Sequence, residues 1–226
     1  MRSISQIIES RFSHSFRRLD ATFYPSLIPM IPLTSLDIWL PDNIIHLPPQ
    51  IVLESVVSLA ITVSLQSSAQ LISTAWTFPR LQHLGLVDFH GSSGIFPSWT
   101  TFVRRHAHTI TSLSFSNWGH CTSASSGLED VIGAATRVRG LIIRDADLCQ
   151  LPHTFTHLSV THLGVIETHL RDDSEARSGP VWALSRGIFP KLKGLKLFLP
   201  ANVCHRYAEL VRLCKNSSVR LEVGDT

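Results

Sequence analysis

The sequence predicts an α/β solenoid, a curved parallel sheet of short strands with helices and turns on its outer side. The main observation is a phrase that occurs eight times: an aliphatic residue, two variable positions, a leucine, one variable position and another aliphatic residue. The central leucines lie 22 to 32 residues apart, which is enough for one strand and its return connection. Helical stripes or turn residues lie between the copies, so residues 32–226 are expected to form about eight irregular repeats.

Each phrase is predicted to be a strand, because its leucine and flanking aliphatic residues would point to one side while the residues between them point to the other. Two copies begin with nearly the same letters, FPRL at 78–81 and FPKL at 189–192, which supports a repeat. The eighth copy has Ser218 in place of the first aliphatic residue. The central leucines are Leu36, Leu59, Leu84, Leu113, Leu141, Leu163, Leu195 and Leu221.

Four connections between the phrases carry the apolar stripe of an amphipathic helix. Ser98 and Asn202 are expected to cap two of these helices, and Ser126 with Glu129 forms a capping-box pattern ahead of a third. Pro79 closes the remaining one. The stripes are Leu71, Ile72, Ala75 and Trp76; Trp99, Phe102, Val103 and His106; Leu128, Val131, Ile132 and Ala135; and Val203, Tyr207, Leu210, Val211 and Cys214.

Other segments are predicted to be non-helical or to lie outside the repeats. Segment 41–49 contains three prolines and segment 145–152 is short, so each is expected to form turns or a single 3₁₀ turn. Segment 167–179 is the most polar stretch and is expected to be an exposed loop. Residues 1–31 are expected to form an N-terminal helical cap, since apolar residues recur at helical spacing between positions 4 and 16.

The composition is typical of an ordered protein inside the cell. Hydrophobic residues make up 44% of the chain and charged residues 16%, which excludes a disordered chain. The net charge of +3 is too small an excess to indicate nucleic-acid binding, and no apolar stretch is long enough to span a membrane. No secretory signal is visible, and the four cysteines form no C-x-x-C pair. We therefore expect reduced thiols and a cytoplasmic or nuclear location.

The sequence nominates neither an enzyme nor a cofactor. Its twelve histidines are scattered over different repeats and lack the ordered Cys/His pairs of a zinc site. A G-x-S-x-G motif and a glycine-rich phosphate loop are both missing from the sequence. We expect no catalytic residue, no metal site and no cofactor; a small hydrolase that uses scattered histidines is the weakest alternative.

The repeats resemble the leucine-rich-repeat region of the F-box and leucine-rich-repeat proteins, especially the irregular kind abundant in fungi. The resemblance rests on the L-x-x-L-x-L phrases and on the segments FPRLQHLGL and FPKLKGLKL, and it covers residues 32–223. It implies a leucine-rich-repeat solenoid that captures a protein substrate. In that family an N-terminal F-box docks onto a cullin ubiquitin ligase, so a cullin-ligase adaptor is a possible partner.

The chain departs from this family in two respects. The asparagine that often stands three positions after the last aliphatic residue is replaced in all eight copies, so the turns must be satisfied differently. The segment ahead of the first phrase is also shorter than an F-box. The segment LPPQIVLES at 47–55 is similar to the start of an F-box, but it lies between two strand phrases. A truncated or diverged family member without a docking function of its own is therefore the alternative.

The outward positions of the strands are predicted to pave the concave face and to bind an unknown protein partner. Most of these positions hold small residues, which would let a partner come close. The larger ones gather toward the C-terminal half, and exposed aromatic residues and arginine are favoured at interface hot spots. The predicted partner-binding residues are Trp39, His83, Arg144, His162, Ile166, Lys196 and Phe198. Together with the resemblance, they predict an intracellular protein-interaction module, which could be the substrate-recognition part of a ubiquitin ligase receptor.

Overall fold

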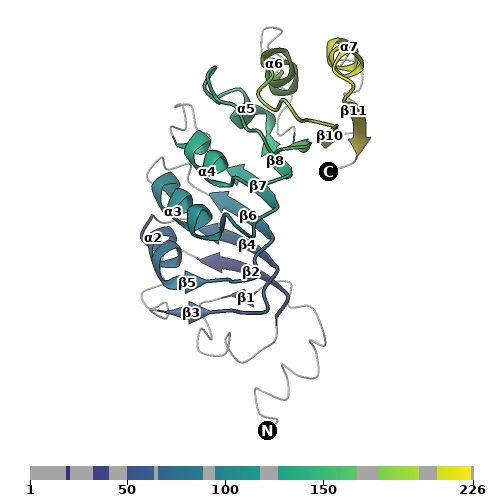
Figure 1. Ribbon diagram of the computed structural model, residues 1–226. Coiled ribbons are helices and arrows are strands. Elements are labelled where there is room, and N and C mark those ends of the chain that lie inside the picture. Colours follow the sequence, from purple (N-terminus) through teal and green to yellow (C-terminus); the bar gives the residue numbers. More distant parts are fainter. Residues whose placement is uncertain are drawn as a thin grey trace.

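A long sheet in which every neighbouring pair of strands is parallel forms one layer of the computed structural model (Figure 1). The structure describes residues 19–20, 33–40, 50–63, 66–88, 95–117, 127–166, 178–198 and 208–224. In spatial order the strands are β1 (Leu19–Asp20), β2 (Ser35–Leu40), β4 (Ser58–Val63), β6 (His83–Asp88), β7 (Ser112–Asn117), β8 (Gly140–Arg144), β9 (His162–Ile166), β10 (Gly194–Phe198) and β11 (Arg220–Gly224). Two short strands, β3 (Ile51–Val52) and β5 (Trp76–Thr77), pair separately.

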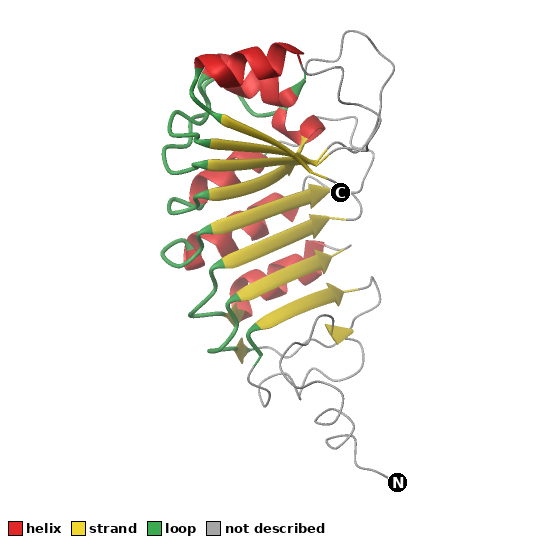
Figure 2. Cartoon of the chain, turned by 90° about the vertical axis from the view of Figure 1, so that its right-hand side faces the viewer, coloured by secondary structure: helices red, strands yellow, loops and turns green. Residues whose placement is uncertain are grey.

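The helices cover one face of this sheet, and Figure 2 shows the opposite face without a covering helix in the described part of the chain. They are α2 (Gln66–Ala75), α3 (Phe96–His106), α4 (Leu128–Ala134), α5 (Asp145–Leu148), α6 (Gly179–Arg186) and α7 (Ala208–Asn216). The stack bends toward its sheet side beyond β7, so the strands line the concave side (Figure 1). The α/β solenoid predicted from the repeated phrase is confirmed, and its architecture is consistent with a leucine-rich-repeat solenoid.

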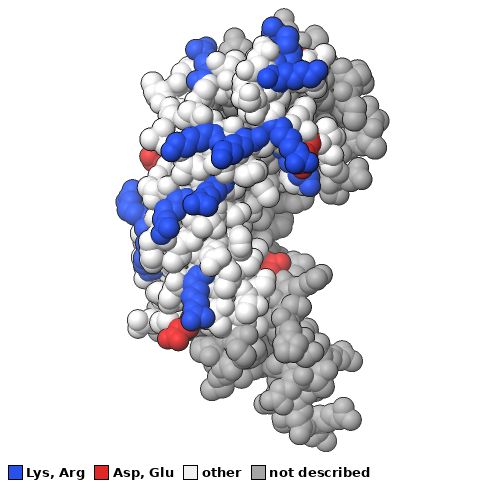
Figure 3. All heavy atoms as spheres, turned by 45° about the vertical axis from the view of Figure 1, so that its right-hand side comes forward, with Lys and Arg blue, Asp and Glu red and all other residues white. Residues whose placement is uncertain are grey.

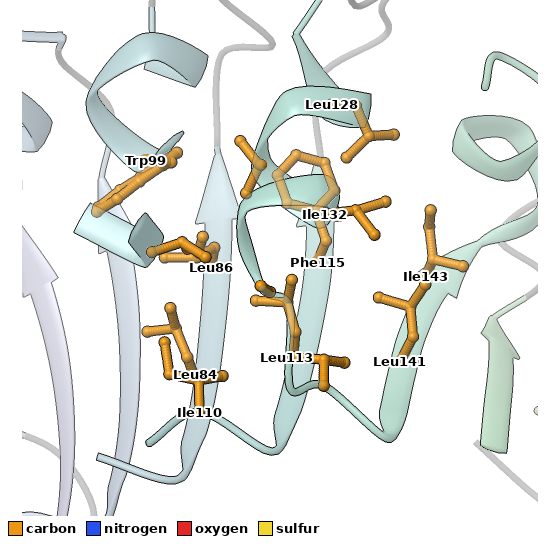
Figure 4. Packing of buried hydrophobic residues seen from close by; sticks show 14 of the residues in the cluster. Leu84, Leu86, Trp99, Ile110, Leu113, Phe115, Leu128, Ile132, Leu141 and Ile143 are labelled. Carbon is orange, nitrogen blue, oxygen red and sulfur yellow. The ribbon is translucent and has the colours of Figure 1, made fainter. Parts of the chain in front are cut away.

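The strand phrases align because equivalent residues pair across the sheet. Leu59 lies opposite Leu84, Leu84 opposite Leu113, and Leu195 opposite Leu163. The leucines and the last aliphatic residues of the first seven phrases point toward the helices and are buried. In the last strand, however, Leu221 is only half-buried. Figure 4 shows how side chains of successive strands meet the helices: Leu84, Leu86, Leu113, Phe115, Leu141 and Ile143 lie beneath Trp99, Leu128 and Ile132.

A buried histidine joins α3 to the preceding repeat. His106 is 2% exposed, and its Nε2 accepts a hydrogen bond of 3.1 Å from the Phe78 main-chain N–H. Its Nδ1 lies 3.0 Å from the Phe102 carbonyl, which requires the proton on Nδ1. Desolvation by burial lowers the pKa of His106, so the neutral ring is the stable form. The histidine that the sequence placed on an apolar helix face is therefore part of the core.

An arginine of α3 closes the C-terminal end of α2. The Arg105 guanidinium donates to the carbonyls of Thr74 (2.9 Å), in the last turn of α2, and of Trp76, the first residue of β5. The last carbonyls of a helix have no partner within the helix, so the bond to Thr74 satisfies one of these groups. Arg105 thus links two successive repeats on the outer layer.

Several local expectations require correction or qualification. Helix α3 begins at Phe96 rather than after Ser98, because Pro97 fits the first turn of a helix. Segment 145–152 contains the short α-helix α5 rather than only turns. Helix α6 begins at Gly179, the last residue of the segment that the sequence predicts to be a loop. In α2 the buried face is centred on Ser68, Ala69, Ile72 and Ser73, and Leu71 is only half-buried.

Other expectations lie wholly or partly outside the described residues. These are the cap residues Ser126 and Asn202, the proline-containing segment 41–49, and residues 167–177 of the predicted loop. Strand β1, which pairs with β2, belongs to the segment 1–31 that was predicted to form an N-terminal cap. The other residues of this segment lie outside the described part of the chain. The helical cap therefore stays a prediction.

Candidate functional site

The open face of the sheet carries the outward residues of each strand in straight rows. The register aligns Arg144, Ile166 and Phe198 in one row across β8, β9 and β10. In the neighbouring row, Ile142 and Lys196 flank Gly164. Five of the seven predicted binding residues therefore come together on three adjacent strands: Arg144, His162, Ile166, Lys196 and Phe198.

The other two predicted residues lie apart from this group. His83 is exposed on β6, and β7 and β8 separate it from β9. Trp39 belongs to β2, where its backbone lies opposite Thr62, but its side chain is outside the described residues. Conversely, Ile142 belongs to the group although it was not selected from the sequence. Its outward position in the phrase could have identified it. We call Ile142, Arg144, His162, Ile166, Lys196 and Phe198 the β8–β10 patch.

Glycines allow the large side chains of the patch to lie flat on the sheet. A Cβ atom on Gly164 would come within 3.0 Å of Phe198 Cε2 and 3.1 Å of Ile142 Cγ1, so both side chains lean over this glycine. His162 leans over Gly194 in the same way, with its Cδ2 2.9 Å from the position of a Cβ. The result is an apolar surface made by Ile142, Ile166 and Phe198, which are all half-buried.

The charged and polar residues around this surface differ in their exposure and in their hydrogen bonds. Arg144 forms two hydrogen bonds of 2.8 Å with the Asp147 carboxylate, and the two side chains are only 11% and 4% exposed. This bidentate pair connects the first turn of α5 to the end of β8, so Arg144 stabilises the local structure. Lys196 is exposed, and its Nζ lies 4.8 Å from the centre of the Phe198 ring, within range of a cation–π interaction. His162 is exposed, and its Nδ1 lies 3.0 Å from Thr161 Oγ1.

Within the described residues, no three His, Cys, Asp or Glu side chains are grouped so that they could hold a metal ion. His157 is 5% exposed, and burial lowers its pKa, as it does for His106. Burial raises the pKa of the Cys214 thiol. These groups are embedded in the solenoid core, where they contribute to packing. Over the same described part of the chain, no helix has the length and apolarity needed to cross a bilayer.

A small cavity lies between the last two repeats. Its volume is about 170 Å³. The lining residues come from α6, from the segment that leads into β10 and from the turn after α7, and they are Ala183, Leu184, Gly187, Phe189, Pro190, Leu192, Ser217 and Val219. This lining contains no titratable side chain. The cavity therefore offers no charged group to a ligand, and the open sheet face is the better candidate for a functional surface.

Comparison of the chain with protein-family models, with curated proteins and with solved structures finds no match. The features of this chain that bear on function are the geometry of the sheet face and the chemistry of its side chains. The chain is an α/β protein with a long all-parallel sheet of strands that alternate with helices.

Proposed function

We propose that this chain is a protein-interaction module that binds a partner protein through the β8–β10 patch. The observation that carries the proposal is the apolar surface of Ile142, Ile166 and Phe198 on a sheet face that no described helix covers. Apolar residues grouped within a charged and polar rim are typical of the centre of a protein interface. Phe198 offers the aromatic anchor, and Lys196 and His162 form part of the rim.

The shape of the surface favours a macromolecular partner over a small molecule. The patch lies on an open sheet and spans three strands, whereas small molecules usually bind in enclosed clefts. Because its side chains already lean on glycines, they lose little rotational freedom when a partner binds. The concave sheet adds small residues at most remaining positions, which lets a partner approach the backbone.

We further propose that the partner is a substrate for ubiquitination and that the chain acts as the recognition part of a receptor in the cytoplasm or nucleus. The resemblance of the repeats to F-box and leucine-rich-repeat proteins supports this finer assignment. Residues 51–55 of the F-box-like segment 47–55 form strand β3 and a turn, so these residues do not form the helical start of an F-box. The competing proposal is a diverged family member without a docking function of its own.

The test is copurification of partners with a tagged chain and two matched variants. Lys196→Glu with Phe198→Ala changes the patch, and Ser58→Glu with Thr62→Ala places a new carboxylate and truncates a side chain on β4 of the same face. We expect at least one protein to be lost only from the Lys196/Phe198 variant. If both variants retain every partner, the β8–β10 patch is not the binding surface. Cullin-ligase subunits in all samples would support the receptor assignment, and chaperones alone would favour the diverged member.

A further inference from the structure

A second surface lies at the edge of the sheet where the strands begin. In the five repeats from β6 to β10, the first aliphatic residue of the phrase is flanked by two outward residues, and the chemistry of these pairs alternates from one repeat to the next. Before β6, β8 and β10 the pairs are Arg80 and Gln82, Arg137 and Arg139, and Lys191 and Lys193; before β7 and β9 they are Thr109 and Thr111, and Ser159 and Thr161. Basic repeats thus alternate with hydroxyl repeats.

Backbone hydrogen bonds place these residues in register. The N–H groups of Arg139, Thr161 and Lys193 each donate over 2.8 Å to the carbonyl of the equivalent residue in the preceding repeat. Neighbouring repeats are therefore about 4.8 Å apart along this row, as in a sheet. Arg139 and Lys193 are two steps apart, which gives a separation of about 10 Å.

The hydroxyl side chains form hydrogen bonds to the preceding repeat and are shorter than the basic side chains on either side. Thr111 Oγ1 donates to the Gln82 carbonyl over 3.4 Å, and Thr161 Oγ1 donates to the Arg139 carbonyl over 3.3 Å. Ser159 Oγ donates over 2.8 Å to a carbonyl of the preceding repeat. These short side chains are used internally, so the longer basic side chains beside them are unobstructed.

The basic side chains at this edge have no acidic partner among the described residues. The described ion pairs join Arg144 to Asp147, Arg212 to Glu209 and Arg220 to Glu222. The members of the edge group are all exposed, and they are Arg80, Arg137, Arg139, Lys191 and Lys193. We call them the strand-start array. Figure 3 shows Lys and Arg side chains gathered over this side of the molecule, with few acidic side chains among them.

One member of the array is held in place. Arg137 Nη1 donates over 2.8 Å to the His108 carbonyl in the turn after α3, which leaves its other N–H groups for a ligand. Figure 3 draws the acidic side chains of this view mostly toward the margins. The array is therefore a surface of one charge sign.

We propose that the strand-start array binds an acidic segment of a protein in an extended conformation that crosses the strand starts. From the repeat of Arg80 to the repeat of Lys193 the array spans four steps, or about 19 Å, which corresponds to about six residues of extended chain. A segment in the extended polyproline II conformation has three residues per turn and rises about 9 Å per turn, so carboxylates three positions apart lie on one side and match the spacing between basic repeats. This surface is separate from the β8–β10 patch and goes beyond the function proposed above.

The chemistry favours an acidic protein over nucleic acid or a membrane. The array contains no aromatic side chain on which a base could stack, and stacking supplies much of single-strand binding. The net charge of the chain is only +3, whereas nucleic-acid-binding domains are usually more basic. The array also lacks an apolar side chain that could insert into a bilayer.

The test measures binding of a fluorescein-labelled octaglutamate peptide by fluorescence polarisation at 50 and 150 mM NaCl. The array variant replaces Arg137, Arg139, Lys191 and Lys193 by Gln. The control variant replaces Arg104, Arg186, Arg212 and Lys215 on the helices by Gln, so that the net charge changes equally. We expect the peptide to bind at least tenfold more weakly to the array variant and within twofold of the parent to the control. Two half variants, Arg137→Gln with Arg139→Gln and Lys191→Gln with Lys193→Gln, should each give part of the loss.

Phe198→Ala separates this proposal from the first one, because it alters the β8–β10 patch without changing charge and should leave peptide binding intact. Absence of binding at 50 mM NaCl would overturn the proposal. An equal loss in the array and control variants would reduce it to an effect of net charge and would also overturn it. Tighter binding of an eight-nucleotide single-stranded RNA, with the same dependence on the array, would assign the surface to nucleic acid instead.

Discussion

Replacement of the buried His106 tests whether the repeats are coupled through a neutral imidazole. In His106→Ala the Phe78 main-chain N–H loses its acceptor, and an unsatisfied buried donor costs about 1–3 kcal/mol. The missing ring also leaves a void beside two aromatic rings, whose centres lie 4.6 Å (Phe102) and 6.0 Å (Phe78) from that of the imidazole. We expect the free energy of unfolding to fall by about 3 kcal/mol in total. His106→Gln keeps an acceptor within reach and should lose about half as much.

The same residue gives stability a defined pH dependence. Desolvation by burial lowers the pKa of His106 in the folded state, and the nearby charges of Arg105 and His108 act in the same direction. The unfolded chain therefore takes up a proton near pH 6.5, where the folded chain does not. The free energy of unfolding should decline as the pH falls below about 6.5 and should stop declining once it is below the folded pKa. One such proton gives a slope of at most about 1.4 kcal/mol per pH unit.

Urea unfolding followed by circular dichroism between pH 8.0 and 5.5 measures both effects. The buried His157 also has a lowered pKa and contributes a similar slope, so His106→Gln should remove only part of the dependence. His157→Gln and the double variant complete the comparison. An unchanged slope in His106→Gln would show that the histidine is not neutral and buried as inferred, and the reasoning on repeat coupling would fail.

Two further predictions concern single positions. Arg105→Met removes the side chain that donates to the carbonyls of Thr74 and Trp76, and it should lower the free energy of unfolding by about 1–3 kcal/mol in urea titrations at pH 7. An effect below a few tenths of a kcal/mol would show that water replaces these bonds. Gly164→Ala places a Cβ 3.0 Å from the Phe198 ring, so it should displace the ring and weaken capture of any partner that the Phe198 variant loses. Unchanged Phe198 ring resonances in NMR spectra would contradict this.

The strands and the inward faces of α3 and α4 could be predicted from the sequence because their signals are periodic. Leu84 and Leu113 stand at the same place in each phrase, and parallel pairing then aligns the copies. The stripe from Trp99 to His106 likewise follows helical spacing and is buried as expected. Periodicity says less about ends, which explains the early start of α3 at Phe96 and the single helical turn of α5.

The candidate site could be predicted only in part, because its properties depend on contacts between repeats. The outward position of Phe198 follows from its phrase, but its contact with Gly164 depends on a pairing between strands that are far apart in sequence. The sequence predicts Arg144 to be an exposed arginine, whereas the structure shows it hydrogen-bonded to the Asp147 carboxylate. The strand-start array contains no two adjacent basic residues, and the net charge of +3 does not reveal it. The signal was the spacing R-x-R and K-x-K in alternate repeats.

The two proposed surfaces can vary independently of the core because a solenoid separates these tasks by position within each repeat. Leu141 and Ile143 hold β8 to the helices, while the residues between and beside them face outward. A substitution at Arg139 or Ile142 therefore changes a surface without removing buried area from the core. In urea titrations the free energy of unfolding of the array and patch variants should accordingly stay within about 0.5 kcal/mol of the parent value, as for ordinary surface substitutions. A larger loss in either would mean that binding and stability share residues, and the separation of the surfaces from the core would have to be abandoned.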